Sequence, residues 1–280
     1  MKIIRASSEM RVASRAAHAK GQRLGFVPTM GALHAGHLAL VGAAKSRCDV
    51  VIASIFVNPL QFGPGEDLSK YPRTFERDCE RLEKEGVEFL FAPPVEEMYP
   101  GNAFTYVHVE GLSEKLDGKS RPGHLRGVTT VVSKLFHIVE PDLAFFGQKD
   151  AAQVAVIRRM VRDLNIPAEI VVCPIVREPD GLAMSSRNAY LDSQQRKSAL
   201  VLNRSLARIR ELFQRGERNG AVLLAAGKQV FGEEPSVRLD YFEIVNPETL
   251  DPVAEITQTS LVAVAAYAGT TRLIDNILLG

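Results

Sequence analysis

The chain has 280 residues, a length that suits one large domain or two modest ones. Its 46% hydrophobic and 24% charged residues exclude a disordered, collagen-like or coiled-coil protein. With 34 basic and 33 acidic side chains the net charge is +1, so no overall basic field favours nucleic acid as a partner. The three widely spaced cysteines form no disulfide framework and offer no Cys-x-x-Cys metal site, as is typical of a reducing cytosol.

Segments that would target or anchor the chain in a membrane are not expected. The first residues, MKIIRAS, turn polar too early for the apolar core of a signal peptide. The longest apolar runs, residues 50–57 and 261–268, are much shorter than a membrane span. We therefore expect a cytoplasmic protein with no membrane partner.

The first part of the chain alternates short apolar runs with helical patterns. We expect strands at residues 24–27, 50–57, 87–91, 143–146 and 170–176, and helices at 37–47, 74–85, 128–139 and 151–164. Such alternation is typical of right-handed βαβ units and a mostly parallel sheet. Ligands bind beyond the carboxyl ends of such strands, so chemistry is expected in the loops that follow them.

The pattern changes after residue 176. Helices are expected at residues 193–214 and 221–231, and strands at 239–245, 261–267 and 272–278. The expected fold class is therefore α/β. We expect a Rossmann-like parallel-sheet domain over residues 1–176, which would carry the ligand-binding loops, and a smaller α+β domain over residues 177–280.

The strongest motif is PTMGALHAGHL, residues 28–38, which follows the first clear strand and opens the first helix. Gly31 and Gly36 allow the backbone to approach a ligand closely. The N–H groups of a helix N-terminus attract phosphate, and imidazole N–H groups of His34 and His37 can bind phosphate oxygens as charge develops. A simple capping turn is the alternative, but two histidines at a strand-to-helix turn favour phosphate binding.

Two further motifs follow expected strands. Asn58 and Gln61, in FVNPLQF, are neutral side chains suited to the hydroxyls and carboxylate of a small polar substrate. In FGQKD, Lys149 offers a charge for phosphate, Asp150 can hold a ribose hydroxyl, and Gln153 lies one turn further on. A polar turn at Asn58 and helix capping by Asp150 remain the plainer alternatives.

Two basic loops complete the candidates. Ser185, Ser186 and Arg187 can clamp a polyphosphate, or they belong to a flexible linker. Arg121 and His124 lie in a compact loop before a helix, which is otherwise a solvated turn. The sequence contains no P-loop, no Gly-x-Gly-x-x-Gly after the first strand and no Gly-x-Ser-x-Gly elbow.

Taken together and in this order, the motifs resemble the pantoate–β-alanine ligase family of the HIGH/KMSKS nucleotidyltransferase superfamily. The resemblance covers residues 26–191 and extends more weakly beyond them; the family usually has Glu where this chain has Ala35. It implies that ATP and pantoate give pantoyl adenylate and pyrophosphate, and that β-alanine then gives pantothenate and AMP. It also implies a homodimer formed through the first domain. From the chemistry of the reaction we expect Mg²⁺ to be held mainly by the triphosphate, with no metal site of the protein's own.

The resemblance assigns a role to each candidate residue. His34 and His37 would contact the triphosphate, His37 at the proton-donor position, and Lys149 with Ser185, Ser186 and Arg187 would stabilise pyrophosphate. The other residues of the nucleotide site would be Pro28, Thr29, Met30, Gly31, Gly36, Gly147, Gln148, Asp150, Val176 and Met184. Gln61, Gln153 and Asn58 would serve pantoate, while Arg121 and His124 would close over the substrates or reach β-alanine.

The chemistry of the residues agrees with this interpretation. A carboxylate nucleophile needs no general base, so positioning and charge neutralisation suffice for the first step. An acyl adenylate must be kept from water, so we expect the second domain to act as a lid. A transferase that moves AMP or CMP onto a phosphate would need more basic residues than Gln61 and Gln153. A shortened aminoacyl-tRNA synthetase would need a basic RNA-binding domain, and a non-catalytic regulator would have lost the histidines or Lys149.

Overall fold

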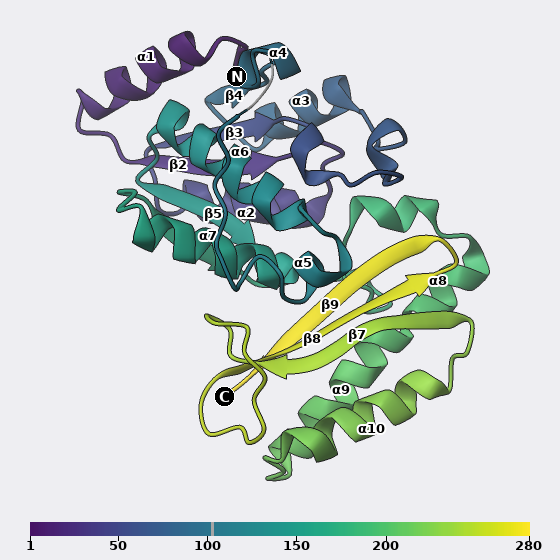
Figure 1. Cartoon of the computed structure of the whole chain (residues 1–280). Coiled ribbons are helices and arrows are strands. Elements are labelled where there is room, and N and C mark those ends of the chain that lie inside the picture. The colour runs from purple at the N-terminus through teal and green to yellow at the C-terminus, as the bar shows by residue number, and fades with distance from the viewer. Residues whose placement is uncertain (102–103) are drawn as a thin grey trace. The chain divides into compact units, whose positions relative to one another are not determined.

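The computed structural model describes residues 1–101 and 104–280 (Figure 1). These residues form two compact units. Residues 1–147 and 156–173 make the first unit, and residues 148–155 and 174–280 make the second. These units are defined by contacts within the chain. The domain limits expected from the sequence, 1–176 and 177–280, remain a prediction.

The first unit is built on a six-stranded parallel sheet in the order β1-β4-β3-β2-β5-β6. Its strands are β1 (Lys2–Ile4), β2 (Leu24–Thr29), β3 (Val50–Ile55), β4 (Phe89–Phe91), β5 (Leu143–Gly147) and β6 (Glu169–Cys173). The expected parallel α/β sheet is thus confirmed. From β2 the chain adds strands first on one side and later, through β5, on the other. In parallel sheets, ligands bind at the strand ends beside such a reversal of order.

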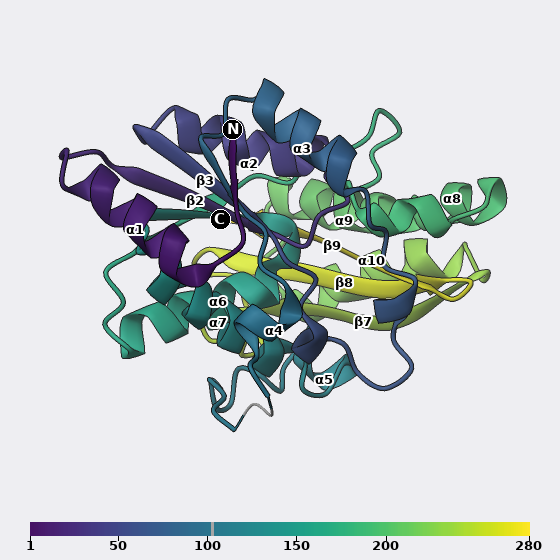
Figure 2. The same ribbon diagram turned by 90° about the horizontal axis from the view of Figure 1, so that it is seen from above.

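Helices cover both faces of this sheet. They are α1 (Ser7–His18), α2 (Ala35–Lys45), α3 (Phe75–Lys84), α4 (Val95–Met98), α5 (Asp117–Ser120), α6 (His124–Val139) and α7 (Ala151–Asp163), with short 3₁₀ turns η1 (Pro59–Gln61) and η2 (Asp67–Ser69). Figure 2 shows α2 and α3 on one side of β2 and β3, and α1 and α6 on the other. Phe26 and Val27 alternate across β2 and are both fully buried, because each face of the sheet is covered.

The main differences from the expected elements in this unit have simple causes. Strand β2 continues through Pro28 to Thr29, since a proline removes one N–H donor and leaves its carbonyl able to accept. Helix α2 begins at Ala35, two residues early, because His34 caps it. Strand β1 and helix α1 were not expected at all. Helix α3 ends before Gly86, whose φ of +76° suits a glycine, as the sequence indicated.

The second unit contains a three-stranded antiparallel sheet in the order β7-β8-β9. Its elements are η3 (Gln148–Asp150), the first residues of α7, η4 (Ser186–Tyr190), α8 (Ser193–Ala199), α9 (Val201–Gln214), α10 (Gly220–Gly232), β7 (Val237–Val245), β8 (Ser260–Ala268) and β9 (Thr271–Leu279). Helices α9 and α10 lie along the sheet in Figure 1. This arrangement confirms the smaller α+β part expected after the parallel sheet.

The core of the second unit lies between these helices and the sheet. Ile209, Leu223, Phe242 and Val264 are among its buried side chains. Gly227 permits this close packing, because a Cβ there would stand only 2.7 Å from Ile209 Cδ1 and 2.8 Å from a ring atom of Phe242. The long helix expected at residues 193–214 is divided at Leu200 into α8 and α9.

Candidate functional site

The loop after β2 is held by the strand that precedes it and by the neighbouring strand β3. The Thr29 hydroxyl donates to the Ser54 carbonyl oxygen at 2.7 Å and accepts from the Gly31 N–H at 3.1 Å. Gly31 has a φ of +82°, and Ala32 also lies in the left-handed region at +49°. The loop therefore turns sharply at the carboxyl end of β2, immediately before α2.

The two motif histidines stand together at the start of α2. Their ring centroids lie 4.1 Å apart. His34 Nδ1 accepts from the Gly36 N–H at 3.2 Å, and His37 Nδ1 accepts from the His34 N–H at 3.3 Å. A ring nitrogen that accepts an N–H carries no proton, so the neutral form of each ring has its proton on Nε2. The backbone thus fixes both histidines as Nε2–H donors at a helix N-terminus.

A buried carboxylate on α3 accepts hydrogen bonds from the backbone of the loop between β2 and α2. Asp78, which is 1% exposed, accepts from the Ala32 N–H at 2.8 Å and from the Leu33 N–H at 2.9 Å, and from the Thr74 hydroxyl at 3.1 Å. Arg81, one turn further along α3, donates to the Leu33 carbonyl oxygen. The same helix thus satisfies both the N–H groups and a carbonyl of the loop that carries the histidines.

Replacing Asp78 by alanine is expected to destabilise the first unit and disorder this loop. The Ala32 and Leu33 N–H groups would lose their acceptor, and each buried group left unsatisfied costs about 1–3 kcal/mol. Urea unfolding of Asp78→Ala measures the loss. Glu80→Ala, at an exposed position of the same helix, is the matched control. Equal unfolding midpoints for the two variants would contradict the assignment.

The turn after β3 contains an amide network around Asn58. This side chain is 1% exposed and donates to Gln61 Oε1 at 3.0 Å and to the Gly127 carbonyl at 3.1 Å. Its Oδ1 accepts from the Tyr99 hydroxyl at 2.8 Å and from the Leu60 N–H at 3.3 Å. Both hydrogens and both lone-pair sites of Asn58 are thus used within the protein, so the geometry makes Asn58 a support for Gln61.

Gln61 links this turn to the loop after β2. Its Nε2 lies 2.9 Å from the Met30 sulfur, and its side chain is 8% exposed. Helix α6 approaches the turn so closely that a Cβ at Gly127 would overlap the Leu60 carbonyl. Met30 of the first motif therefore meets Asn58 and Gln61 of the second motif in one cluster.

Arg121 and His124 join this cluster at the Gln61 carbonyl. His124 Nδ1 lies 2.8 Å and Arg121 Nη2 3.3 Å from that oxygen, and Arg121 Nη1 lies 2.9 Å from His124 Nε2. Arg121 also forms a two-pronged pair with Glu66, at 2.9 and 2.6 Å. The sequence had suggested that His124 lies in the loop before the helix. In the structure it is the first residue of α6.

The pH dependence of stability is expected to reveal His124. Burial, followed by the charge of Arg121, lowers the pKa of His124 to about 4, against opposing effects of the Gln61 carbonyl, Asp117 and Glu66. An unfolded histidine takes up its proton near pH 6.5. The stability from neutral His124 is therefore complete above pH 6.5 and is lost as pH falls toward 4, by about 3 kcal/mol in total.

Urea unfolding at pH 7.5, 6 and 5 tests this expectation. As pH is lowered, the free energy of unfolding should fall more steeply in the parent protein than in His124→Gln, which cannot be protonated at this position. His137→Gln is the matched control, because His137 lies on the same helix and its Nδ1 is 2.7 Å from the Ser133 carbonyl oxygen. Parallel pH curves for the parent and His124→Gln would overturn the assignment.

In the second unit, the turn after β5 presents Lys149. Gly147 ends β5, and Gln148, Lys149 and Asp150 form η3 directly before α7. The Lys149 side chain is 20% exposed, and its Nζ lies 3.7 Å from Asp150 Oδ1. Gln153 follows in the first turn of α7 and is partly buried.

The segment from Val176 to Asn188 forms a tight loop in the same unit. The Met184 N–H donates to the Val176 carbonyl at 3.0 Å, and Arg177 pairs with Ala183 across the loop. Ser185 then caps η4, with its hydroxyl accepting from the Arg187 N–H at 3.3 Å. Ser186 and Arg187 are therefore part of a 3₁₀ turn.

The candidate residues thus form separate groups. In the first unit the structure brings His34 and His37 together, and Met30, Gln61, Asn58, Arg121 and His124 together. In the second unit the Lys149 ammonium group pairs with the Asp150 carboxylate, and the Met184 N–H donates a hydrogen bond to the Val176 carbonyl. Among residues 1–101 and 104–280, no cluster of three or more His, Cys, Asp or Glu is placed to hold a metal ion. No helix in these ranges is both long and apolar enough to cross a bilayer.

Sequence reasoning missed several residues of these groups. Glu66 and Tyr99 bind the candidate residues Arg121 and Asn58, and Asp78 binds the loop that carries the histidines. Asp275 and Asn276 bind segments of the second unit. Each lies dozens of residues from its partner, so no local motif contains it. The one available signal was a pair of polar residues, Asp275-Asn276, inside an otherwise apolar strand pattern.

Comparison with known proteins identifies the class to which this fold and these groups belong: the protein is an α/β enzyme of the ligase type. The family model described as pantoate-beta-alanine ligase matches residues 2–278. The chain belongs to the pantoate–β-alanine ligase family, as its motifs indicated.

Relatives resemble the chain over nearly its whole length. It is 61% identical over 279 residues to the pantothenate synthetase of Koribacter versatilis, covering 100% of this chain and 96% of the relative. Identity to the pantothenate synthetase of Acidobacterium capsulatum is 65% over 257 residues, which are 92% of this chain and 86% of the relative.

Solved structures of the family share the fold. The pantothenate synthetase of Thermus thermophilus is 48% identical, with a TM-score of 0.94 and 99% of both chains covered. The pantoate-beta-alanine ligase of Francisella tularensis, complexed with beta-gamma ATP and beta-alanine, is 35% identical. Its TM-score is 0.77, with 99% of this chain and 97% of that chain covered.

Proposed function

We propose that this enzyme activates pantoate with ATP as a pantoyl adenylate and then transfers the pantoyl group to β-alanine. The observation that carries the proposal is the pair of histidines, each fixed by a backbone N–H as an Nε2–H donor at the start of α2. Such donors stabilise charge that develops on phosphate oxygens, and they need no rearrangement when it appears. ATP and β-alanine as ligands are further supported by the complex of the Francisella tularensis relative.

In the first step, a pantoate carboxylate oxygen attacks the α-phosphorus of ATP. The bond from that phosphorus to the bridging oxygen of the β-phosphate breaks, and pyrophosphate leaves with the bonding electrons. We assign His34 and His37 to the phosphates, and Lys149 with Ser185, Ser186 and Arg187 to the charge that builds up on pyrophosphate. The nucleophile is already ionised, so no side chain has to remove a proton from it.

In the second step, the neutral amine of β-alanine attacks the acyl carbon of the adenylate. The carbon–oxygen bond to AMP breaks with its electrons staying on the AMP oxygen, the nitrogen gives up one proton to water, and pantothenate and AMP are released. We assign Gln61 and Gln153 to pantoate, with Asn58 holding Gln61 in place. We assign Arg121 and His124 to closing over the substrates or reaching β-alanine. Within the protein, the Arg121–Glu66 pair and the Gln61 carbonyl fix the two side chains.

The remaining ligand assignments follow from the donor set. Mg²⁺ prefers carboxylate, phosphate and water oxygens. We therefore assign its ligands to the oxygens of the triphosphate and to water. When bound, the ion would neutralise phosphate charge. The remaining nucleotide-site residues named from the sequence, the homodimer and the lid role of the second domain also stay proposals.

The test is the release of AMP and pyrophosphate from ATP, Mg²⁺, pantoate and β-alanine, with each component omitted in turn. We expect AMP to form only when ATP, Mg²⁺, pantoate and β-alanine are all present. Exchange of labelled pyrophosphate into ATP should need pantoate but not β-alanine, because only the first step is reversed. Exchange that needs β-alanine, or is absent with pantoate, would rule out a free adenylate step.

A further inference from the structure

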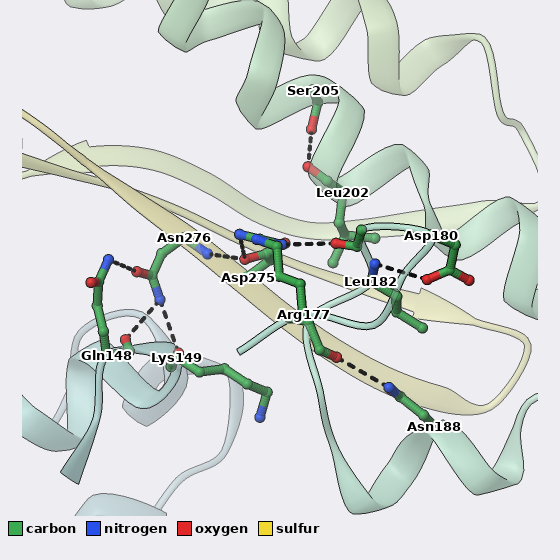
Figure 3. Close-up of polar contacts among 12 residues, drawn as sticks. Gln148, Lys149, Arg177, Asp180, Leu182, Asn188, Leu202, Ser205, Asp275 and Asn276 are labelled. Atoms are coloured by element: carbon green, nitrogen blue, oxygen red, sulfur yellow. Dashed lines mark hydrogen bonds and ion pairs between the residues drawn. The ribbon is translucent and has the colours of Figure 1, made fainter. Parts of the chain in front are cut away.

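Strand β9 carries two adjacent buried polar side chains, Asp275 and Asn276, between apolar residues. Asp275 is 3% exposed and Asn276 2% exposed, while the neighbouring Leu273, Ile277 and Leu279 are buried apolar residues of the core. Polar groups at this depth are stable only when they are hydrogen-bonded. Their partners show why they are there, because both bind segments outside the sheet (Figure 3).

Asn276 binds the turn that carries Lys149. Its Nδ2 donates to the Gln148 carbonyl at 3.0 Å and to the Lys149 carbonyl at 2.9 Å. Its Oδ1 accepts from Gln148 Nε2 at 3.1 Å. The two amide hydrogens thus fix two successive carbonyls of η3, and Figure 3 shows this bridge between β9 and the turn. A carboxylate has no hydrogens to offer these carbonyls, and a serine has one.

Asp275 binds the loop that leads to Ser185. Its oxygens accept from Arg177 Nη1 at 2.7 Å and Nη2 at 2.9 Å, and Arg177 Nη1 also donates to the Gly181 carbonyl at 3.0 Å. The Asp275 Oδ1 accepts the Asn276 N–H at 2.7 Å as well. Two adjacent residues of one strand therefore hold both segments of the second unit to which phosphate chemistry is assigned.

We propose that Asn276 is a positioning residue for the adenylation step, which acts by fixing the backbone of Lys149. The proposal rests on the function proposed above for Lys149. A rigid backbone places the ammonium group where charge appears on the leaving pyrophosphate, and small displacements of such a group are costly. The loss should therefore fall on kcat and leave the KM for ATP nearly unchanged.

A double-mutant cycle of Asn276→Ala and Lys149→Ala tests the proposal, with pyrophosphate exchange into ATP as the readout. Asn276→Ala alone should lower the exchange rate by about 10- to 100-fold. In the Lys149→Ala background the same substitution should lower it by less than about twofold, because the group it positions is gone. Asn276→Ser, which keeps one donor, should fall between the parent and Asn276→Ala.

Ile277→Val is the matched control, since it removes a methyl group from the neighbouring buried position and no hydrogen bond to η3. It should change the unfolding midpoint but not the exchange rate. Equal effects of Asn276→Ala in both backgrounds, or normal exchange in Asn276→Ala and Asn276→Ser, would overturn the positioning role. Normal exchange in Lys149→Ala would instead overturn the function assigned to Lys149, and the inference with it.

Discussion

Lys149→Ala is expected to lower kcat/KM for ATP by about 10²- to 10³-fold, the usual effect of removing one group that stabilises developing charge. Lys149 is the middle residue of η3, and its side chain is only 20% exposed. Its charge is therefore screened less by water than the charge of a fully exposed lysine. Steady-state kinetics with ATP varied and pantoate and β-alanine saturating measure the loss.

Lys228→Ala is the control for this experiment. Lys228 lies on the exposed side of α10, in the same unit, and its loss removes the same charge from the protein. Its kinetics should equal those of the parent. If both lysine variants lost activity by the same factor, the effect would come from net charge and not from the position of Lys149.

Removing the carboxylate of Asp275 is expected to cost about 3–5 kcal/mol of stability, because breaking a buried ion pair leaves one charge without its partner. The pair joins Asp275, 3% exposed, to Arg177, 25% exposed, through two hydrogen bonds of 2.7 and 2.9 Å. Hydrogen exchange of the β8 and β9 amides in Asp275→Ala reports the loss for the second unit alone.

A surface pair provides the comparison. Arg208→Gln breaks the half-exposed pair between Arg208 and Glu211 on α9 and should leave amide exchange in β8 and β9 nearly unchanged. The double variant Arg177→Ala with Asp275→Ala should be less destabilised than the sum of the two single variants. Strictly additive losses would show that the two side chains contribute separately.

Most of the fold was predictable because its strands and helices have strong local patterns. The β-branched run at residues 50–57 contains β3, and the expected helix at residues 151–164 matches α7 to within one residue. These local patterns did not predict where the helices and strands end. Leu164 was expected as the last residue of that helix, but it follows the last helical residue and is 52% exposed.

The candidate site was predictable only where its chemistry is local in sequence. His34 and His37 are three residues apart, so one helix N-terminus brings them together. The groups that hold them are distant: Asp78 reaches Ala32 across 46 residues, and no spacing rule links the two. The same is true of Tyr99, whose hydroxyl binds Asn58 across 41 residues. Such partners are set by packing of separate elements, which a single sequence does not encode in a readable pattern.

The bond between Asn276 and the Lys149 carbonyl also sets a time scale for the newly made chain. The two residues are separated by 127 positions. At about 5–20 residues per second, a ribosome takes roughly 6–25 s to add that length. Throughout this interval the lysine turn exists without the strand that anchors it. Phosphate chemistry in the second unit is therefore expected to wait for synthesis of β9, however early the parallel sheet begins to form.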